Sequence, residues 1–262
     1  MRMFRRGVTL VALTAFALLA ALPLTLVPAA SPKEELASTG PAVESPPRSA
    51  AAGLLAALRS KIPLQPLALQ GDPYITWQAS APPVAPAGSV CGVRFELDQV
   101  HYRLSTFANS DAARSAGFAV THFGACGTCS TLQDLAVYLE KPDLTAPVRR
   151  CGIKWSASAN LMCLEHLGFS AACAQTWLYN VQNTRRQCLS HCLWSWIEGE
   201  APTRTDGRLN ACLQCDEDRS GPVFKATAGR TRRNSGIRSS IPRPDDEIAP
   251  VVHDYVPDIA PR

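Results

Sequence analysis

The residues with the clearest chemical potential are two cysteines in the segment Cys126-Gly-Thr-Cys129. Two cysteines at this spacing can form a reversible disulfide, and a helix that begins beside them lowers the pKa of the first thiol. Ser130 followed by Gln133 is a capping box, which predicts such a helix. One hypothesis is therefore a thiol–disulfide oxidoreductase in which Cys126 is the nucleophile and Cys129 is the resolving thiol.

The elements that would position this pair are a strand before it and a helix after it. Alternating apolar residues predict strands over 93–107, with a turn near 98–99, and over 118–123. A short helix is expected over 112–116, and the helix after the pair ends at Lys141, before a proline. This order is similar to the front half of the thioredoxin-like fold, and the resemblance implies a redox role. The alternative is that each cysteine forms a structural disulfide elsewhere.

All ten cysteines lie in the stretch 91–215, a density typical of exported domains held together by disulfides. Cys188 and Cys192 are neighbours on one face of a predicted helix, so each is expected to pair with another element. Cys163 and Cys173 are candidate partners for them, although spacing alone does not fix the pairing. The ten disulfide candidates are Cys91, Cys126, Cys129, Cys151, Cys163, Cys173, Cys188, Cys192, Cys212 and Cys215.

An apolar segment and the distribution of proline divide the chain. Residues 1–30, in which arginines precede an uncharged run over 7–30, are typical of a signal peptide or of a transmembrane signal anchor. Residues 31–90 hold 10 of the 21 prolines and no cysteine, which favours a largely disordered spacer. The cysteines define a globular domain over 91–225, and 226–262 form a basic, then acidic, C-terminal segment.

The predicted fold is mainly helical with a small β element at its front, in the α+β class. Within the spacer, residues 49–62 are either one amphipathic helix or a transient one, and 74–77 are the first piece expected to dock on the domain. After the sheet, helices are expected over 160–167 and 170–196. We expect up to five disulfides to stabilise this single domain behind the apolar anchor and the proline-rich spacer.

A second CxxC pair, Cys212 and Cys215, could join the first pair in a four-thiolate zinc site. His122 and His191 are further candidate ligands. However, 82 residues separate the two pairs, which exceeds the usual zinc-ribbon spacing, and an oxidising compartment favours disulfides over thiolates. Zinc binding is therefore an alternative to structural disulfides and ordinary structural histidines.

An acidic stretch resembles the start of a calcium-binding loop. Asp216, Asp218 and Ser220 place oxygen ligands at alternate positions, and Gly221 follows them. The twelfth position is Thr227, where such a loop needs a bidentate glutamate. The simpler interpretation is an acidic turn after a helix, so calcium and zinc are cofactors that the sequence suggests without requiring.

The basic segment that follows is predicted to bind an anionic ligand or a protein partner. Arginine side chains suit phosphate, sulfate or carboxylate, and interleaved glycines expose backbone N–H groups. The segment lacks interleaved aromatic residues, so nucleic acid is not an expected partner. The simpler interpretation is a solvated basic tail. The candidate anion-binding residues are Lys225, Arg230, Arg232, Arg233 and Arg238.

The leading functional hypothesis is a non-enzymatic binding or interaction module outside the cytoplasm, either secreted or held in a membrane through 7–30. A net charge of +4 does not by itself indicate nucleic acid. The sequence has no GxSxG nucleophile motif, no P-loop and no dinucleotide-binding glycine motif. Thiol–disulfide exchange and metal binding are the two alternatives.

Overall fold

The computed structural model of the protein describes residues 48–78 and 81–256, with side chains from residue 52 onward. These residues belong to one compact unit, Ser45–Arg262. The leader predicted over 1–30 lies outside the described residues. The fold is α+β, as expected, with a four-stranded sheet, several helices and five disulfides.

The sheet contains the two strand regions predicted from sequence. β2 and β3 form an antiparallel hairpin, and Gln99 in its turn has a φ of 57°. The carboxylate of Asp98 accepts hydrogen bonds from the N–H groups of Val100 (3.0 Å) and His101 (2.9 Å), which stabilises this turn. The spatial order is β1-β3-β2-β4, in which only the β1–β3 pair is parallel. The strands are β1 (Ile62–Pro63), β2 (Val90–Phe95), β3 (His101–Phe107) and β4 (Ala119–Phe123).

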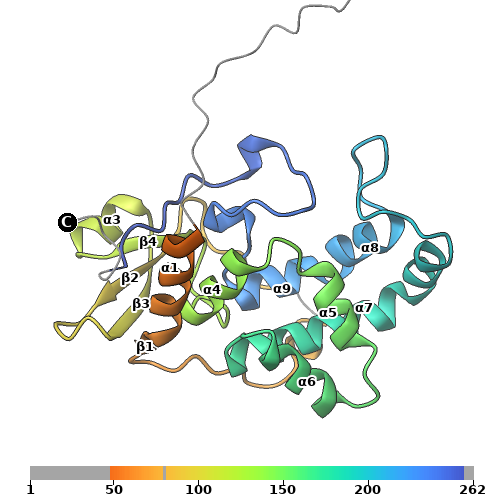
Figure 1. Ribbon diagram of the computed structural model, residues 1–262, viewed down its shortest axis with the longest axis horizontal. Coiled ribbons are helices and arrows are strands. Elements are labelled where there is room, and N and C mark those ends of the chain that lie inside the picture. The colour runs from red at the N-terminus through yellow and green to blue at the C-terminus, as the bar shows by residue number, and fades with distance from the viewer. Residues whose placement is uncertain (1–47, 79–80, 257–262) are drawn as a thin grey trace, which may run out of the picture. The chain divides into compact units, whose positions relative to one another are not determined.

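Helices make up most of the rest of the described chain. Figure 1 shows the sheet on one side of the domain, α5 to α8 on the other, and α4 and α9 between them. The α-helices are α1 (Arg48–Ser60), α2 (Pro73–Thr76), α3 (Ser110–Ser115), α4 (Leu132–Glu140), α5 (Thr145–Gly152), α6 (Ala157–His166), α7 (Ala171–Ile197), α8 (Ala211–Arg219) and α9 (Gly221–Ala228), and the 3-10 helices are η1 (Arg233–Ser235) and η2 (Asp245–Glu247).

The long helix α7 begins after Ser170, as the sequence predicts. The hydroxyl of Ser170 accepts a hydrogen bond from the N–H of Cys173 at 3.4 Å. Asp134, fully buried in α4, accepts hydrogen bonds from the N–H and the hydroxyl of Ser170, both at 2.8 Å. This carboxylate therefore links the first turns of α4 and α7. Burial raises the pKa of Asp134 to about 6 because the charged form is poorly solvated there.

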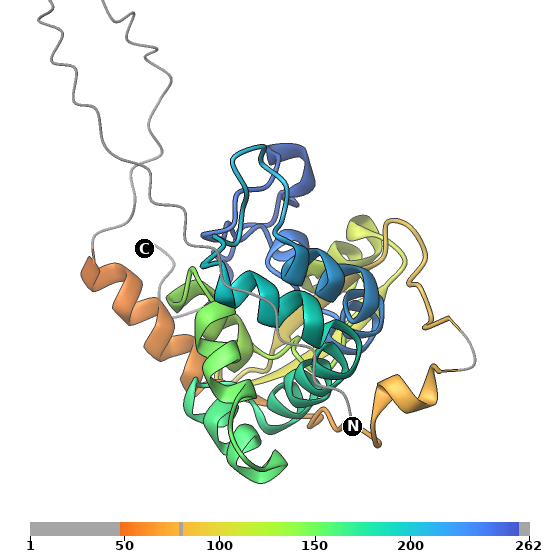
Figure 2. The ribbon, with the colours of Figure 1, turned by 90° about the vertical axis from the view of Figure 1, so that its right-hand side faces the viewer.

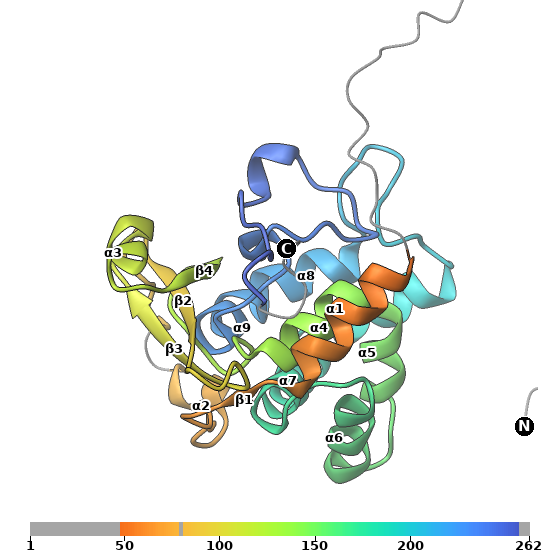
Figure 3. The ribbon, with the colours of Figure 1, turned by 60° about the vertical axis from the view of Figure 1, so that its left-hand side comes forward.

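The folded domain begins well before the boundary predicted at residue 91. α1 packs beside α4 (Figure 3), and Leu58 in α1 is fully buried in the core. The side chain of Tyr74 in α2 is also buried, and its hydroxyl lies 2.7 Å from the side-chain oxygen of Asn180. The amphipathic helix and the docking piece expected within 31–90 are confirmed. They are integral to the domain because they bury apolar side chains, which the proline-rich composition concealed.

The chain after α9 crosses back over the domain. We call residues 229–256 the C-terminal strap, part of which is dark blue in Figure 2. The N–H of Ala249 donates to the carbonyl of Arg233 at 2.8 Å, and Val256 is 1% exposed at the end of the strap. The segment predicted to be a basic tail is therefore packed into the fold up to this point.

Five disulfides join all ten cysteines, which fits an oxidising, extracytoplasmic or secreted environment. The expectation that Cys188 and Cys192 each pair with another element is confirmed. Their suggested partners, Cys163 and Cys173, were wrong because α8 places two other cysteines alongside α7. None of the described helices is both long and apolar enough to cross a membrane. The pairs are Cys91–Cys126, Cys129–Cys173, Cys151–Cys163, Cys188–Cys215 and Cys192–Cys212.

Candidate functional site

The two cysteines of the predicted redox pair are not bonded to each other. Cys126 is joined to Cys91 in β2, and Cys129 is joined to Cys173 in α7. Cys129 and Cys173 are fully buried. The described residues include no free thiol, so a redox reaction would first require one of these two disulfides to open. The structure thus has the arrangement expected of structural disulfides.

The backbone around Gly127 is held tightly against the end of α9. The N–H groups of Thr128 and Cys129 donate to the carbonyl oxygens of Thr227 (3.0 Å) and Ala228 (2.9 Å). A Cβ atom at Gly127 would overlap these backbone atoms. The glycine between the two cysteines is therefore required for close packing of two backbone segments.

The helix cap expected at Ser130 is instead at Thr131, the N-cap residue of α4. The hydroxyl of Ser130 accepts a hydrogen bond from the N–H of Gly127 at 2.8 Å and lies 2.7 Å from Nε2 of His122. Nδ1 of His122 lies 2.9 Å from the carbonyl oxygen of Phe123, so this nitrogen carries the proton and Nε2 accepts from the serine. Burial lowers the pKa of His122 well below its usual value. His122 is thus neutral and fully hydrogen-bonded, with no nitrogen free to bind zinc.

Arg230, a predicted anion-binding residue, is fully buried in the C-terminal strap. All five of its N–H donors have oxygen partners within the protein. An anion therefore cannot reach this guanidinium, and desolvation lowers the pKa of Arg230. The partners are the carbonyl (3.0 Å) and hydroxyl (2.6 Å) of Thr121, the carbonyls of Cys129 and Ser130 (both 3.2 Å) and the hydroxyl of Ser235 (3.2 Å).

The other four predicted anion-binding residues also have partners inside the domain. One donates to backbone carbonyls, and three pair with carboxylates, among which Glu217 in α8 serves two of them. These contacts attach the C-terminal strap to the helices and do not gather the cations into an open site. The partners are Tyr138 O and Lys141 O for Arg232, Glu217 for Lys225, Glu217 and Glu247 for Arg233, and Asp245 for Arg238.

The predicted calcium ligands Asp216 and Asp218 lie on α8, and Ser220 follows directly at the junction with α9. Asp216 accepts a hydrogen bond from the hydroxyl of Thr184, whereas Asp218 accepts one from Gln214 at 2.9 Å on the surface. Ser220, four residues after Asp216, also contacts the Thr184 hydroxyl, but Asp218 is two residues from each and leaves α8 on the other side, so the three oxygens do not converge as they would in a calcium loop. Across 48–78 and 81–256, no group of three or more His, Cys, Asp or Glu side chains is placed to hold a metal ion.

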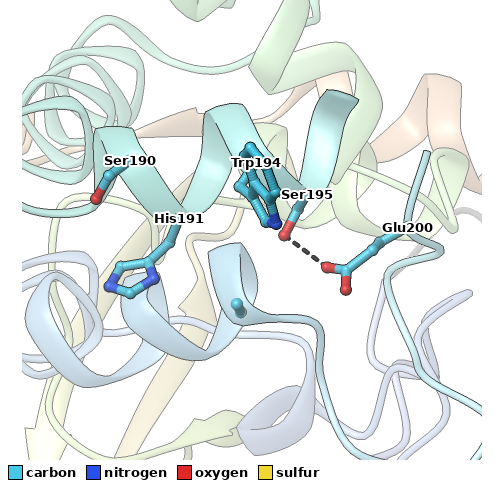
Figure 4. A pocket seen from close by; sticks show the side chains of 6 residues that line it. Ser190, His191, Trp194, Ser195 and Glu200 are labelled. Atoms are coloured by element: carbon cyan, nitrogen blue, oxygen red, sulfur yellow. Dashed lines mark hydrogen bonds between the residues drawn. The ribbon is translucent and has the colours of Figure 1, made fainter. Parts of the chain in front are cut away.

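A cavity of about 350 Å³ lies at the C-terminal end of α7. Ser195 donates a hydrogen bond to Glu200 at 2.7 Å, and Figure 4 shows the imidazole of His191 directed away from this pair. The serine, histidine and carboxylate are therefore not arranged as a catalytic relay. The lining residues are Ser190, His191, Trp194, Ser195, Glu200 and Ala211.

A second cavity, of about 340 Å³, lies where α2, α7 and the α8–α9 junction meet. Its lining includes two guanidinium groups, three side-chain amides and an indole ring, but no carboxylate from the described residues. We call it the arginine cavity. It is lined by Tyr74, Ile75, Trp77, Gln78, Asn183, Arg186, Gln187, Arg219 and Val223.

Two residues that line the arginine cavity, Tyr74 and Asn183, belong to a buried hydrogen-bond network. The hydroxyl of Tyr74 lies 2.7 Å from the side-chain oxygen of Asn180 and 3.0 Å from the carbonyl of Ser220. The amide of Asn183 donates to the hydroxyl of Ser220 at 3.1 Å. Burial raises the pKa of Tyr74 and that of Asp216, to which Asn180 donates at 3.4 Å. This network fixes the wall of the cavity.

The two arginines give the cavity its positive charge. Arg186 lies 3.6 Å from Asp72, while Arg219 has no side-chain hydrogen bond or ion pair with any described residue. Guanidinium groups bind carboxylate, sulfate and phosphate through paired charge-assisted hydrogen bonds. The half-buried indole of Trp77 offers an apolar surface beside them. The cavity can therefore accept a small anionic group that carries an apolar or ring-shaped neighbour.

Sequence reasoning missed this cavity because its residues come from three distant segments, 74–78, 183–187 and 219–223. No residue spacing links Arg186 to Arg219. The one available signal was the expectation that residues 74–77 are the first piece that docks on the domain.

Comparisons with known proteins find a similarity to one family over part of the chain and no activity. A profile described as "Family of unknown function (DUF8771)" matches residues 157–251. This part of the chain is similar to that family and contains both Arg186 and Arg219, but not the α2 wall of the cavity. No curated protein and no solved structure matches the chain.

Proposed function

We propose that the protein is a non-enzymatic extracytoplasmic binding module that recognises a small anionic group in the arginine cavity. The observation that carries this proposal is the placement of Arg186 and Arg219 around one cavity whose described lining has no carboxylate. The five disulfides support a domain that remains folded outside the cytosol.

The arginine cavity is held in shape before a ligand binds. Cys188 follows Arg186 by two residues and is bonded to Cys215, which precedes Arg219 by four residues. Because residues four apart lie on the same side of a helix, this disulfide fixes α7 and α8 close to both guanidinium groups. Because the helix backbones are fixed, the conformational entropy lost on binding is limited to that of the two arginine side chains, which favours affinity.

Asp72 would position one of these cations. Its side chain is 10% exposed, and Oδ1 accepts the N–H of Tyr74 at 2.9 Å as the cap of α2. The 3.6 Å contact of Arg186 with Oδ2 leaves donors of that guanidinium available to a ligand. The anionic group would therefore bind between Arg186 and Arg219 without displacing Asp72.

The experiment that tests the proposal is calorimetric titration of the full chain with inorganic phosphate, sulfate and a series of carboxylates at constant ionic strength. Arg186→Gln with Arg219→Gln should weaken binding of the best of these probes by about tenfold or more, since each charge-assisted hydrogen bond contributes about 1.5–3 kcal/mol.

The matched control removes the same charge elsewhere. Arg149→Gln with Arg150→Gln alters two exposed arginines in the last turn of α5. This variant should bind like the wild type. Equal weakening in both variants would show that binding reflects net charge alone and would overturn the proposed site, as would unchanged binding in the first variant.

A further inference from the structure

The last turns of α7 carry an exposed apolar face. Five large apolar side chains there are between 49% and 68% exposed, a concentration unusual for a single helix of a soluble domain. Four of them lie within about 100° of one another around the helix, and we call these four the α7 apolar face. It consists of Leu189, Leu193, Trp196 and Ile197, whereas Trp194 lines the cavity at the end of α7.

The α7 apolar face is not the face that packs on the domain. Leu189, Leu193 and Trp196 are spaced by four and three residues, so they form one stripe. Cys188 and Cys192 leave α7 about 100° around the helix from Leu189 and Leu193, and both are bonded to α8. Since α8 occupies that side, the stripe is left uncovered by the described parts of the chain.

Positive charge lies directly beside this apolar stripe. Arg186 precedes Leu193 by seven residues and Ile197 by eleven, so all three leave α7 in nearly the same direction. Arg186, which lines the arginine cavity, therefore leaves α7 on the same side as the α7 apolar face, about one turn closer to the N-terminus of the helix. Glu198 and Glu200 follow the face and mark its other end.

We propose that this side of α7 docks on an anionic lipid surface, with the α7 apolar face in the interface and a headgroup phosphate in the arginine cavity. The headgroup part rests on the function proposed above. Trp196 suits this surface because indole rings favour the boundary between headgroups and acyl chains. Arg186 and Arg219 supply the charge complementary to anionic lipid.

The chain that precedes the described residues favours lipid over a second copy of the protein as the occupant. The uncharged run over 7–30 ends 17 residues before α1, the interval 31–47. Seventeen residues span at most about 60 Å. If that run is inserted in a bilayer, α7 stays within reach of the same bilayer, which raises the effective concentration of lipid at the α7 apolar face.

The test uses the full chain in vesicles of phosphatidylcholine, alone or mixed with phosphatidylserine, that contain a photoactivatable acyl-chain probe. Peptide mapping after illumination should find label on residues 189–197. The control surface is the exposed set Ile153, Trp155 and Met162, which lies on α6 and the preceding turn and has no such stripe. Absence of label from 189–197, or equal label on both surfaces, would overturn the proposal.

A charge within the stripe provides a second test. Leu193→Asp with Ile197→Asp alters two exposed positions and should leave the disulfides intact, yet labelling of 189–197 should fall about tenfold or more because two apolar side chains would leave the interface. Ile153→Asp with Met162→Asp should not change it. If the wild type is a dimer in detergent and Leu193→Asp with Ile197→Asp is a monomer, the α7 apolar face binds a second copy of the protein. That result would overturn the lipid assignment.

The two proposals fail in different ways. Leu193→Asp with Ile197→Asp should retain binding of inorganic phosphate, whereas Arg186→Gln with Arg219→Gln should lose it and should also lose the extra labelling caused by phosphatidylserine. If the arginine variant binds phosphate normally but 189–197 is still labelled, the proposed anion site and its headgroup role are both overturned while the apolar contact stands. If labelling is absent but phosphate binding is normal, only the lipid proposal is overturned.

Discussion

Nη2 of Arg230 donates a 2.6 Å hydrogen bond to the hydroxyl of Thr121, although 109 residues separate the two in the chain. Thr121 is fully buried in β4, and its hydroxyl also lies 2.8 Å from that of Tyr255. The two contacts attach both the beginning and the end of the C-terminal strap to one strand of the sheet. The strap therefore contributes to the stability of the domain.

Replacing Arg230 should be strongly destabilising. Arg230→Met leaves buried carbonyl and hydroxyl oxygens without donors, so the free energy of unfolding should fall by about 3–5 kcal/mol. Guanidinium-induced unfolding with the disulfides intact measures this change. Arg238→Met, which removes only an exposed ion pair with Asp245, should leave the free energy of unfolding nearly unchanged because solvent screens that pair. Similar small losses in both variants would contradict the structural role of Arg230.

Adding one methyl group should have opposite effects at two glycines. Gly127→Ala would place Cβ against the backbone at the end of α9, so it should cost about 3 kcal/mol or prevent folding. Gly53→Ala, in the exposed interior of α1 with no atom within 4 Å, should stabilise by about 0.5–1 kcal/mol. Thermal unfolding of the two variants measures both changes in stability. A Gly127→Ala variant as stable as the wild type would show that the backbone contact is absent.

The disulfide pairing can be read directly from peptides. Alkylation without reductant should modify no cysteine, and non-reducing digestion should link Cys126 to Cys91 and Cys129 to Cys173. Mass spectrometry of the linked peptides makes this measurement. A peptide that contains a Cys126–Cys129 disulfide, or selective alkylation of these two after mild reduction, would restore the oxidoreductase hypothesis.

Asp134 should make the wild type lose stability as pH rises. Its pKa of about 6 in the folded state lies above the usual value of 3.8, so the folded protein binds more protons between these values. The contribution of Asp134 is thus fully present below about pH 4 and is lost as pH rises through about 6. Asp134→Asn should remove this dependence, which unfolding free energies measured from pH 4 to 7 would show.

His253 contributes in the opposite direction over the same range. Burial lowers its pKa from 6.5 to about 4, so its contribution is present above about pH 6.5 and is lost as pH falls through 4. In Asp134→Asn the stability should therefore rise from pH 4 to 6.5. Buried His122 acts in the same direction, so the part due to His253 is the decrease in this rise when His253→Gln is added to Asp134→Asn. An equal rise in both variants would mean that His253 is not buried in its neutral form.

Local features of the fold could be predicted from sequence, and distant contacts could not. The hairpin around Asp98, the cap at Ser170 and the end of α4 at Lys141 follow from short patterns, and the structure contains all three. α8 was missed because none of its apolar side chains is fully buried, so it lacks an apolar period. Two disulfides to α7 stabilise α8 instead. These cysteines pair across 20 and 27 residues, so no local sequence pattern indicates the pairing.

The candidate binding residues show the same contrast between local features and distant contacts. The sequence of 225–238 shows where the basic side chains are, but it does not show whether they are exposed. Their hydrogen-bond partners lie up to 109 residues away in the chain. The buried Arg230 is locally indistinguishable from the exposed Arg238. Conversely, Arg186 and Arg219 sit in helices without a motif, and only the packing of α7 on α8 brings them to one cavity.

The paired disulfides between α7 and α8 also determine what proteolysis can do. The connection between the helices, residues 198–210, is mostly exposed and includes Arg204 and Arg208. A protease that cuts there would leave both fragments covalently joined through Cys188–Cys215 and Cys192–Cys212. The two fragments would therefore stay together as one covalently joined molecule until the disulfides were reduced.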